Sequence, residues 1–260
     1  SEMCIRDRYF SARDDVNFQD LDLVVAGPAV QQANRIFDDY WNSSTAIPIS
    51  ALASYSDEQL RQLVRQSDLD ALHARAQPYL QRVAASRSLQ RPSPEPLHWS
   101  ANVRIASDPP MKHRDDDRHH WLVNTLSDEL ATTRRSALLI SPYFVPGSDG
   151  VMGLSGLAAR GAQVGVVTNS LAANDVAAVH GGYMGYRVQL LKAGVQLYEL
   201  KAHGQPDTSL FGSSGASLHT KAFVVDDRRG FVGSFNLDPR SAYLNTEMGV
   251  LFDDPVLGAQ

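Results

Sequence analysis

Two stretches decide the fold of this chain: residues 218–226 read LHTKAFVVD, and residues 233–236 read GSFN. Apolar runs at 221–226 and 230–234 predict two short strands, and the polar residues between the runs predict a turn. The stretches therefore predict a pair of joined strands that brings the polar residues of both into one region.

Upstream of this pair, helical and strand patterns alternate from residue 118 onward. Helices are expected to end near residues 133, 160 and 193, each before a strand, at 137–140, 164–167 and 195–200, and a last strand is expected at 248–252. Helices that separate short β-branched strands are typical of a sheet with parallel members. We therefore predict an α/β fold with a mixed sheet and helices on both faces.

The residue types in the two stretches suit chemistry on a phosphate. His219 and Lys221 are two positions apart, so on a strand both side chains would face the same cleft. An imidazole can attack phosphorus or carry a proton, and an ammonium can hold phosphate oxygens as charge develops. Gly233 would let the backbone approach the phosphate, and Ser234 and Asn236 would add neutral donors.

This pattern resembles the signature of the phospholipase D superfamily, His-x-Lys, four residues, Asp, six residues, Gly-Ser-x-Asn. All six defining positions match at the expected spacing, with Asp226 as the acidic member, better suited to fixing the loop or pairing with a base than to meeting the phosphate. The resemblance covers most of the chain, from about Tyr9 to Gly258. The run 168–186 is most similar to the bacterial cardiolipin synthase branch.

The resemblance implies a phospholipase D-like repeat fold and an activity on phosphodiester bonds. Family members hydrolyse phosphodiesters or transfer phosphatidyl groups through a phosphohistidine, with no metal or organic cofactor. Two motifs face each other, one histidine attacking phosphorus and the other protonating the leaving alcohol. Only the motif of His219 is complete here, so a missing N-terminal half or a second copy is expected to supply the other. The chain alone is expected to be inactive.

An internal repeat supports a second, nearly complete unit after a truncated first one. Residues 247–257 align without gaps on residues 20–30, so that acid, apolar strand, proline and apolar helix start recur at one offset. The alignment predicts a strand at 21–26, followed by a helix opened by Pro28. The resemblance implies that Glu247 binds the non-reacting nitrogen of His219, and the alignment then assigns its counterpart Asp20 to the missing histidine.

The chain is expected to divide into four parts. Residues 1–8 are expected to be a non-native tail, 9–91 a remnant of the first repeat with a helical insert, 92–117 a proline-rich linker with a connecting strand, and 118–260 the second repeat. Within the insert, Ser56 and Gln59 form the pattern of a capping box before a helix at 57–75.

Three further residues are candidates for substrate binding. Tyr143 and Asn169 follow predicted strands, at the carboxyl ends where open α/β sheets bind ligands, and His180 follows on or near the next helix. The alternative interpretation is that Asn169 caps a helix and Tyr183 packs in the core.

Composition limits the classes of function. A formal net charge of −5 makes nucleic acid an unlikely partner. One cysteine excludes an internal disulfide, and no apolar run is long enough to span a bilayer. With the resemblance, these features predict a peripheral protein that meets phospholipid at the membrane surface, on the cytoplasmic side of a bacterial inner membrane. A phospholipase D-type nuclease or phosphodiesterase on nucleic acid, or a catalytically inactive half-protein, remains the alternative.

Overall fold

A computed structural model describes most of the chain. The described residues are 16–72, 77, 81, 84–85, 98–114, 117–174, 176–202 and 215–259. The expected tail at 1–8 and the prolines at 91–96 lie outside them.

Within the described part, the main body is a seven-stranded mixed sheet with strand order β2-β9-β8-β7-β3-β4-β5. Strands β3, β4 and β5 run parallel, and the other neighbours are antiparallel. Their bounds are β2 Val103–Ser107, β3 Ser136–Ile140, β4 Gln163–Asn169, β5 Gln196–Leu200, β7 Ala222–Val225, β8 Arg229–Gly233 and β9 Met248–Asp253. The strands after residue 118 agree with the prediction to within one or two residues.

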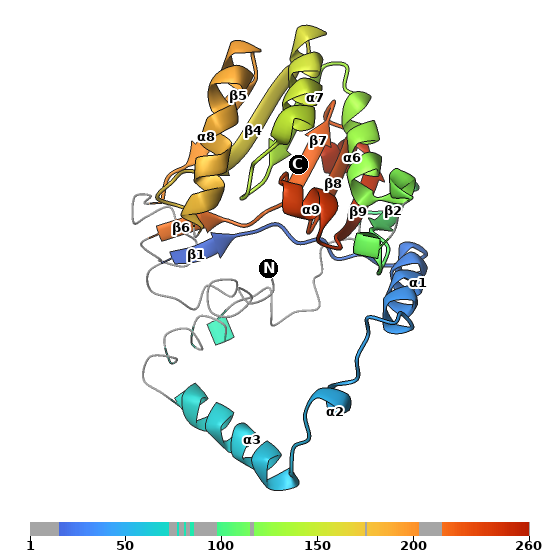
Figure 1. Ribbon diagram of the computed structural model, residues 1–260, viewed down its shortest axis with the longest axis vertical. Coiled ribbons are helices and arrows are strands. Elements are labelled where there is room, and N and C mark those ends of the chain that lie inside the picture. Colours follow the sequence, from blue (N-terminus) through green and yellow to red (C-terminus); the bar gives the residue numbers. More distant parts are fainter. Residues whose placement is uncertain are drawn as a thin grey trace.

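Helices flank this mixed sheet, which confirms the α/β fold class, although helices were expected on both faces and the three long ones after residue 118 lie over one. Helices α6 (Leu122–Ala131), α7 (Gly147–Ala159) and α8 (Ala177–Lys192) lie over one face in Figure 1, and the short α9 (Pro239–Tyr243) lies below them. The core forms between this face and the helices, from Leu122, Leu139, Val166, Leu190 and Val225, each at most 1% exposed. Short helical turns η2 (Lys112–Arg114) and η3 (Arg118–His120) precede α6, and α10 (Pro255–Gly258) follows β9.

The N-terminal segment joins the main body at one place that matters for the site. Strand β1 (Val16–Gln19) pairs in parallel with β6 (Gly215–Leu218), and the two lie side by side below the main sheet in Figure 1. Helix α1 (Ala29–Trp41) contacts β2, and α2 (Ile49–Leu52) and α3 (Asp57–Leu72) follow. The predicted capping box is confirmed, since Gln59 N donates to Ser56 Oγ at 3.2 Å and Ser56 N donates to Gln59 Oε1 at 2.8 Å.

The predicted buried strand at 21–26 is wrong. These residues are not in a strand, and Leu21 and Val24 are 48% and 91% exposed. An apolar run becomes a strand only where neighbouring strands accept its backbone hydrogen bonds, and the described residues supply no such neighbour here. The helix opened by Pro28 is confirmed, but Phe37 and Trp41 on its apolar face are 60% and 70% exposed and stack on each other.

A buried ion pair holds together the segments that lead into the site. Lys112 Nζ donates to Asp108 Oδ2 at 2.8 Å, to Ser241 O at 2.8 Å and to Asn245 O at 3.0 Å. Both side chains of the Lys112–Asp108 pair are 0% exposed. All three ammonium protons therefore have acceptors, which is the condition for a buried lysine to be tolerated.

Asp108 extends this network to two further elements. Its Oδ1 accepts from Leu122 N at the start of α6, at 2.8 Å, and its Oδ2 accepts from Glu247 N at 3.0 Å. The pair thus ties the end of β2, the start of α6, the loop after α9 and the start of β9 together. None of the described helices is both long and apolar enough to cross a membrane.

Replacing one member of this pair tests its contribution to stability. Lys112→Met leaves the buried Asp108 carboxylate without its cation, so the free energy of unfolding should fall by about 3–5 kcal/mol. Arg104→Met is the matched control, because the Arg104–Glu129 pair is partly exposed and should contribute less than about 1 kcal/mol. Urea unfolding followed by circular dichroism measures both, and equal losses would contradict the assignment.

Candidate active site

Residues of β1 and the residue directly after it fix His219, which follows β6. His219 N donates to Gln19 O at 2.8 Å, and the Phe18 ring stacks on the imidazole with ring centroids 4.7 Å apart. His219 and Lys221 lie between β6 and β7 instead of on one strand, so the predicted reason for their common direction is wrong. The imidazole is oriented by stacking and by its backbone.

The carboxylate on the imidazole is Asp20. Asp20 Oδ2 lies 2.5 Å from His219 Nδ1, and both side chains are about one-fifth exposed. Burial by itself raises the pKa of the Asp20 carboxyl, but the hydrogen bond and the charge of His219, together with smaller contributions from Leu21 N–H and Lys221, hold the pKa below its ordinary value. The prediction that Glu247 binds His219 and that Asp20 serves another histidine is therefore corrected: Asp20 takes the position on His219.

Glu247 has a different set of partners. Its Oε2 accepts from Ser234 Oγ at 2.5 Å, and its Oε1 accepts from Ser241 Oγ at 2.8 Å and from Asn245 Nδ2 at 3.2 Å. The side chain is buried, and Glu247 N donates to the Asp108 carboxylate. Glu247 is thus held by hydroxyl and amide donors as well as by the buried ion pair behind it.

Lys221 links the two halves of the motif. Its ammonium donates to the carbonyl of His219, and its own carbonyl accepts from Gly233 N at 3.1 Å. The side chain is buried, and its positive charge is one of the causes that lower the pKa of both Asp20 and Asp238. Burial nevertheless holds the pKa of Asp238 above its ordinary value. The structure therefore brings the His-x-Lys and Gly-Ser-x-Asn stretches together, as predicted.

Gly233 is needed for strand packing. A Cβ there would lie 2.6 Å from the Cα of Gly249 on β9 and 2.6 Å from the Phe231 ring, which is far inside contact distance. Close approach of β8 to β9 accounts for this glycine, in place of the predicted approach of its backbone to a phosphate.

Asn236 carries an unusual buried atom. The side chain is 6% exposed, and its Oδ1 has no hydrogen-bond partner among the described residues. Its backbone N–H donates to Ser241 Oγ at 3.2 Å, and that hydroxyl also binds Glu247. Because buried polar atoms are normally paired, the orphan amide is a candidate contact for a bound molecule.

Asp226 is remote from this cluster. It follows β7, five positions after Lys221, which is roughly 16 Å at the rise of a strand. Its carboxylate accepts from the backbone N–H groups of Arg134, Arg135 and Ser136, at 2.7 to 3.3 Å. The prediction that Asp226 fixes a loop is confirmed. Its assignment to the catalytic set is corrected, because its carboxylate oxygens already accept hydrogen bonds from the backbone at the start of β3.

The structure gives Asn169 a positioning role instead of the predicted contact with substrate. Asn169 is 1% exposed, its Oδ1 accepts from Leu218 N at 2.8 Å, and its Nδ2 donates to Leu218 O at 3.0 Å. This pair of bonds fixes the backbone immediately before His219. An amide whose two polar atoms are both bound to backbone in the interior is not available to a ligand.

The other two substrate-binding candidates are placed differently. His180 is 5% exposed and packs edge-on against Tyr183, whose ring lies in the core as the alternative interpretation expects. Burial, together with Glu199, which accepts from its hydroxyl, raises the pKa of Tyr183 to about 12. The Nδ1 of His180 is buried and has no hydrogen-bond partner among the described residues, so ring packing does not account for this polar atom, and the proposed role of His180 in substrate binding stays a prediction. Tyr143 lies beyond the end of β3, where its carbonyl accepts from Ser141 Oγ, and its role stays a prediction.

Sequence reasoning missed several residues that hold the site. Phe18 and Gln19 carry no chemical signature and act through stacking and a carbonyl. Ser241 and the Asp108–Lys112 pair lie outside the motif. A lysine four residues after an aspartate, the spacing of 108 and 112, is a weak signal because most such pairs are solvated. Among the described residues, no group of three or more His, Cys, Asp or Glu side chains is arranged to hold a metal ion.

The role of Asp226 can be tested through pH. Asp226→Asn keeps an acceptor oxygen and tolerates the positive φ of 56°, but it removes the charge. Backbone hydrogen bonds outweigh burial and lower the pKa of Asp226 from 3.8. The stabilisation is therefore present at neutral pH and lost as pH falls through the lowered folded-state pKa.

We expect Asp226→Asn to lower the free energy of unfolding by about 1–2 kcal/mol at pH 7, and the difference from wild type to shrink below pH 4. Urea titrations at pH 7 and pH 3 measure this. Asp227→Asn is the control, since Asp227 also has a positive φ of 55° but is exposed. A loss of unfolding free energy that is the same at pH 7 and pH 3 would contradict the conclusion that the charge of Asp226 stabilises the fold.

The chain is similar in sequence to known proteins. A family model described as "Cardiolipin synthase, PLD-like domain" matches residues 126–260. Cardiolipin synthase C of Escherichia coli (strain K12) is 36% identical over 261 residues, which cover 97% of this chain and 55% of that protein. Cardiolipin synthase A of Yersinia pseudotuberculosis serotype O:1b (strain IP 31758) is 32% identical over 126 residues, 48% of this chain and 23% of that protein.

The fold also resembles that of a solved structure. The crystal structure of phosphatidylserine synthase from Haemophilus influenzae Rd KW20 matches 88% of this chain and 49% of that chain, with a TM-score of 0.51 and 16% identity. The chain spans about half the length of the curated relatives that it matches over nearly its whole extent. Since the family model covers just over half of its residues, the chain belongs to the phospholipase D superfamily, in the family of cardiolipin synthase PLD-like domains.

Proposed function

We propose that this chain forms one half of an active site that hydrolyses phosphodiester bonds or transfers phosphatidyl groups in phospholipids, as a cardiolipin synthase does. The hydrogen bond between Asp20 and His219 Nδ1 is the observation that carries the proposal. A carboxylate on one imidazole nitrogen fixes the tautomer and directs the other nitrogen, Nε2, to the chemistry.

The reaction needs two histidines in different protonation states. One histidine forms an N–P bond while the P–O bond to the leaving alcohol breaks, and the other gives its proton to that oxygen. Water or an acceptor alcohol then attacks the phosphohistidine, losing its proton to the second histidine. His219 supplies one of these two roles, and a histidine outside this chain supplies the other.

Lys221 and Asn236 suit the phosphate. The buried ammonium of Lys221 lies next to His219, where it would stabilise negative charge on the non-bridging oxygens. Because Asn236 Oδ1 has no partner among the described residues, the amide can turn over without breaking a hydrogen bond of that oxygen, and its NH₂ group would then donate to an oxygen of the substrate. The Ser234 hydroxyl is already engaged by Glu247 and acts by holding that carboxylate.

Glu247 serves the second histidine in this proposal. Asp20 precedes the proposed second repeat in the sequence and binds His219, the histidine of that repeat. By the internal alignment, Glu247 of the second repeat corresponds to Asp20, so the same twofold arrangement gives Glu247 to the histidine of the first repeat. That histidine comes from an N-terminal half or from a second copy of the chain, and relatives about twice as long favour the former.

The substrate class follows from the relatives. Proteins called cardiolipin synthase match this chain at 32–36% identity, which favours a phospholipid whose phosphate lies at a membrane surface. We propose that the protein works peripherally there, on the cytoplasmic side of a bacterial inner membrane.

Substitutions test the role of the Asp20–His219 pair in the protein that includes the upstream half. His219→Asn should abolish phosphatidyl transfer and hydrolysis, and Asp20→Asn should lower kcat by about 10²–10⁴-fold, because the tautomer and its charge are no longer fixed. Release of the headgroup alcohol from phosphatidylglycerol or phosphatidylethanolamine measures both. Asp22→Asn, an exposed carboxylate two positions along, should retain activity. Full activity of His219→Asn would sink the proposal.

Chelation tests whether the activity depends on a metal ion. Because two histidines and a lysine supply all the charge stabilisation in this mechanism, activity of the same protein should be unchanged by about 5 mM EDTA after dialysis, within the few-fold range of salt effects. A loss of activity that added Mg²⁺ or Zn²⁺ restores would contradict the two-histidine mechanism.

A further inference from the structure

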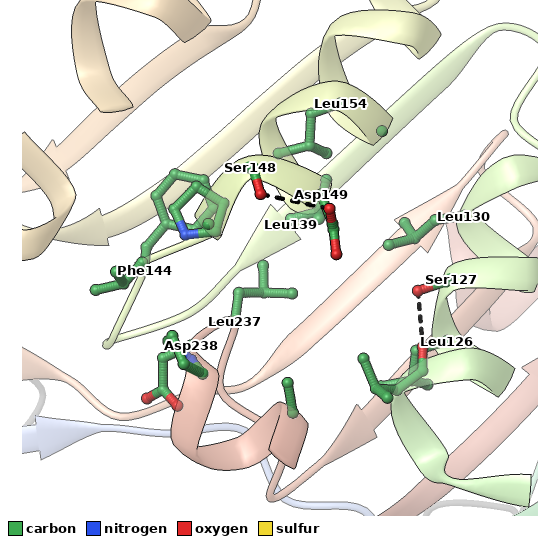
Figure 2. Close-up of a pocket in the computed structure, with 18 of the residues that line it drawn as sticks. Leu126, Ser127, Leu130, Leu139, Phe144, Ser148, Asp149, Leu154, Leu237 and Asp238 are labelled. Atoms are coloured by element: carbon green, nitrogen blue, oxygen red, sulfur yellow. Dashed lines mark hydrogen bonds between the residues drawn. The ribbon is translucent and has the colours of Figure 1, made fainter. Parts of the chain in front are cut away.

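A large apolar pocket lies next to the motif, on the helix-covered face of the sheet. Its volume is about 540 Å³, and it lies between α6, α7 and α9, with β3 as its floor. Figure 2 shows leucines from α6 and α7 converging on it. The apolar lining includes Leu126, Leu130, Leu139, Phe144, Leu154 and Leu237.

The pocket shares a wall with the active site. Phe235 and Leu237 line it, and they flank Asn236 in sequence. Asp238 also lines the pocket, and the charge of Lys221 offsets a small part of the burial that raises the pKa of its carboxyl. One short segment therefore presents Asn236 to the phosphate site and its apolar neighbours to the pocket.

Polar groups are confined to the margin of the pocket. Ser148 and Asp149, at the start of α7, are exposed, and Ser148 Oγ donates to Asp149 Oδ1 at 3.4 Å. The floor is formed by Leu139 and Phe144, each 1% exposed. Arg160, which is exposed, also lines the pocket, so the margin carries charges of both signs. The apolar floor disfavours any charged group inside and favours an uncharged hydrocarbon.

We propose that this pocket takes one hydrocarbon chain of the phospholipid whose phosphate binds at His219 and Lys221. The inference rests on the proposed function and adds to it a place for the apolar part of the substrate. The volume lies in the range of roughly 300–1,000 Å³ that is usual for small-molecule sites. A protein helix takes up on the order of 500 Å³ per turn, so the pocket would hold scarcely more than one turn. A single flexible chain fits it better.

Gly153 offers a way to fill the pocket without disturbing the fold. It lines the pocket from α7, and a Cβ added there meets no atom within 4 Å. Gly153→Leu should place its side chain in the open space. Gly185→Leu is the matched control, because Gly185 is also an interior glycine of a helix with open space around it, but it does not line the pocket. Leucine favours helices more than glycine does, so neither variant should unfold.

The experiment measures how affinity depends on chain length. Phosphatidylglycerols with two butanoyl, hexanoyl or octanoyl chains, kept below their micelle concentrations, are titrated calorimetrically into the wild-type chain and the variants. Deacylated glycerophosphoglycerol is the probe without chains. Affinity should rise about fourfold for each methylene that enters the pocket, in the wild type and in Gly185→Leu. Gly153→Leu should abolish this rise and bind the deacylated probe as the wild type does.

Two results would overturn the proposal. One is the same chain-length dependence in Gly153→Leu as in the wild type. The other is a flat dependence in the wild type, as expected if a protein segment occupies the pocket. His219→Asn separates the pocket from the proposed function: it should weaken all phosphate-containing probes by one common factor and keep the dependence on chain length. An unchanged affinity in His219→Asn would count against the phosphate site alone and leave the pocket standing.

Discussion

The contact between the Asp20 carboxylate and His219 Nδ1 joins segments 199 positions apart and organises everything around the motif. An imidazole on a loop can rotate about two bonds, and neither its direction nor its tautomer is defined by the backbone alone. Here the stacked ring of Phe18 fixes the plane, and Asp20 fixes which nitrogen carries the hydrogen. Because Phe18 lies in β1 and Asp20 follows it directly, the pairing of β1 with β6 is a condition for a defined active site.

The two acidic residues related by the internal repeat are held in contrasting ways. Asp20 is partly exposed and depends on His219 for its low pKa, once burial is overcome. Glu247 is buried among the hydroxyls of Ser234 and Ser241, and its backbone is anchored to the Asp108–Lys112 pair. A carboxylate fixed so firmly by neutral donors keeps its position without the imidazole, which suits a residue whose proposed partner lies outside this chain.

Much of the structure after residue 118 was predictable from the sequence because its signals are local. The strands β7 and β8, their turn and the strands before them follow from apolar runs of the right length, and the capping box at Ser56 follows from two residues three apart. The spacing of the motif sufficed to bring Lys221 next to Gly233, since paired strands convert spacing into proximity.

What the sequence did not reveal depends on contacts between distant segments. The run 21–26 has the composition of a strand, but its hydrogen bonds would need neighbours that the described residues do not provide. The sequence could not show that Asp20, and not Glu247, binds His219. A repeat alignment equates two positions, but it does not say which histidine each carboxylate binds. Asn169 was assigned to substrate because its position beyond a strand is typical of ligand sites, and only its bonds to Leu218 reveal the other role.

The parallel pairing of β1 with β6 also affects how the chain folds. The pairing of Val16 with Gly215 closes a loop of about three-quarters of the chain. Contacts over such a long range form late, because much chain entropy must be lost before any of them stabilises the folded state. The main sheet from β2 to β9 consists mostly of nearer neighbours and can assemble first. Until β1 pairs with β6, the imidazole of His219 would have no fixed orientation. The reactive side chain would therefore become ordered only after the main sheet has folded.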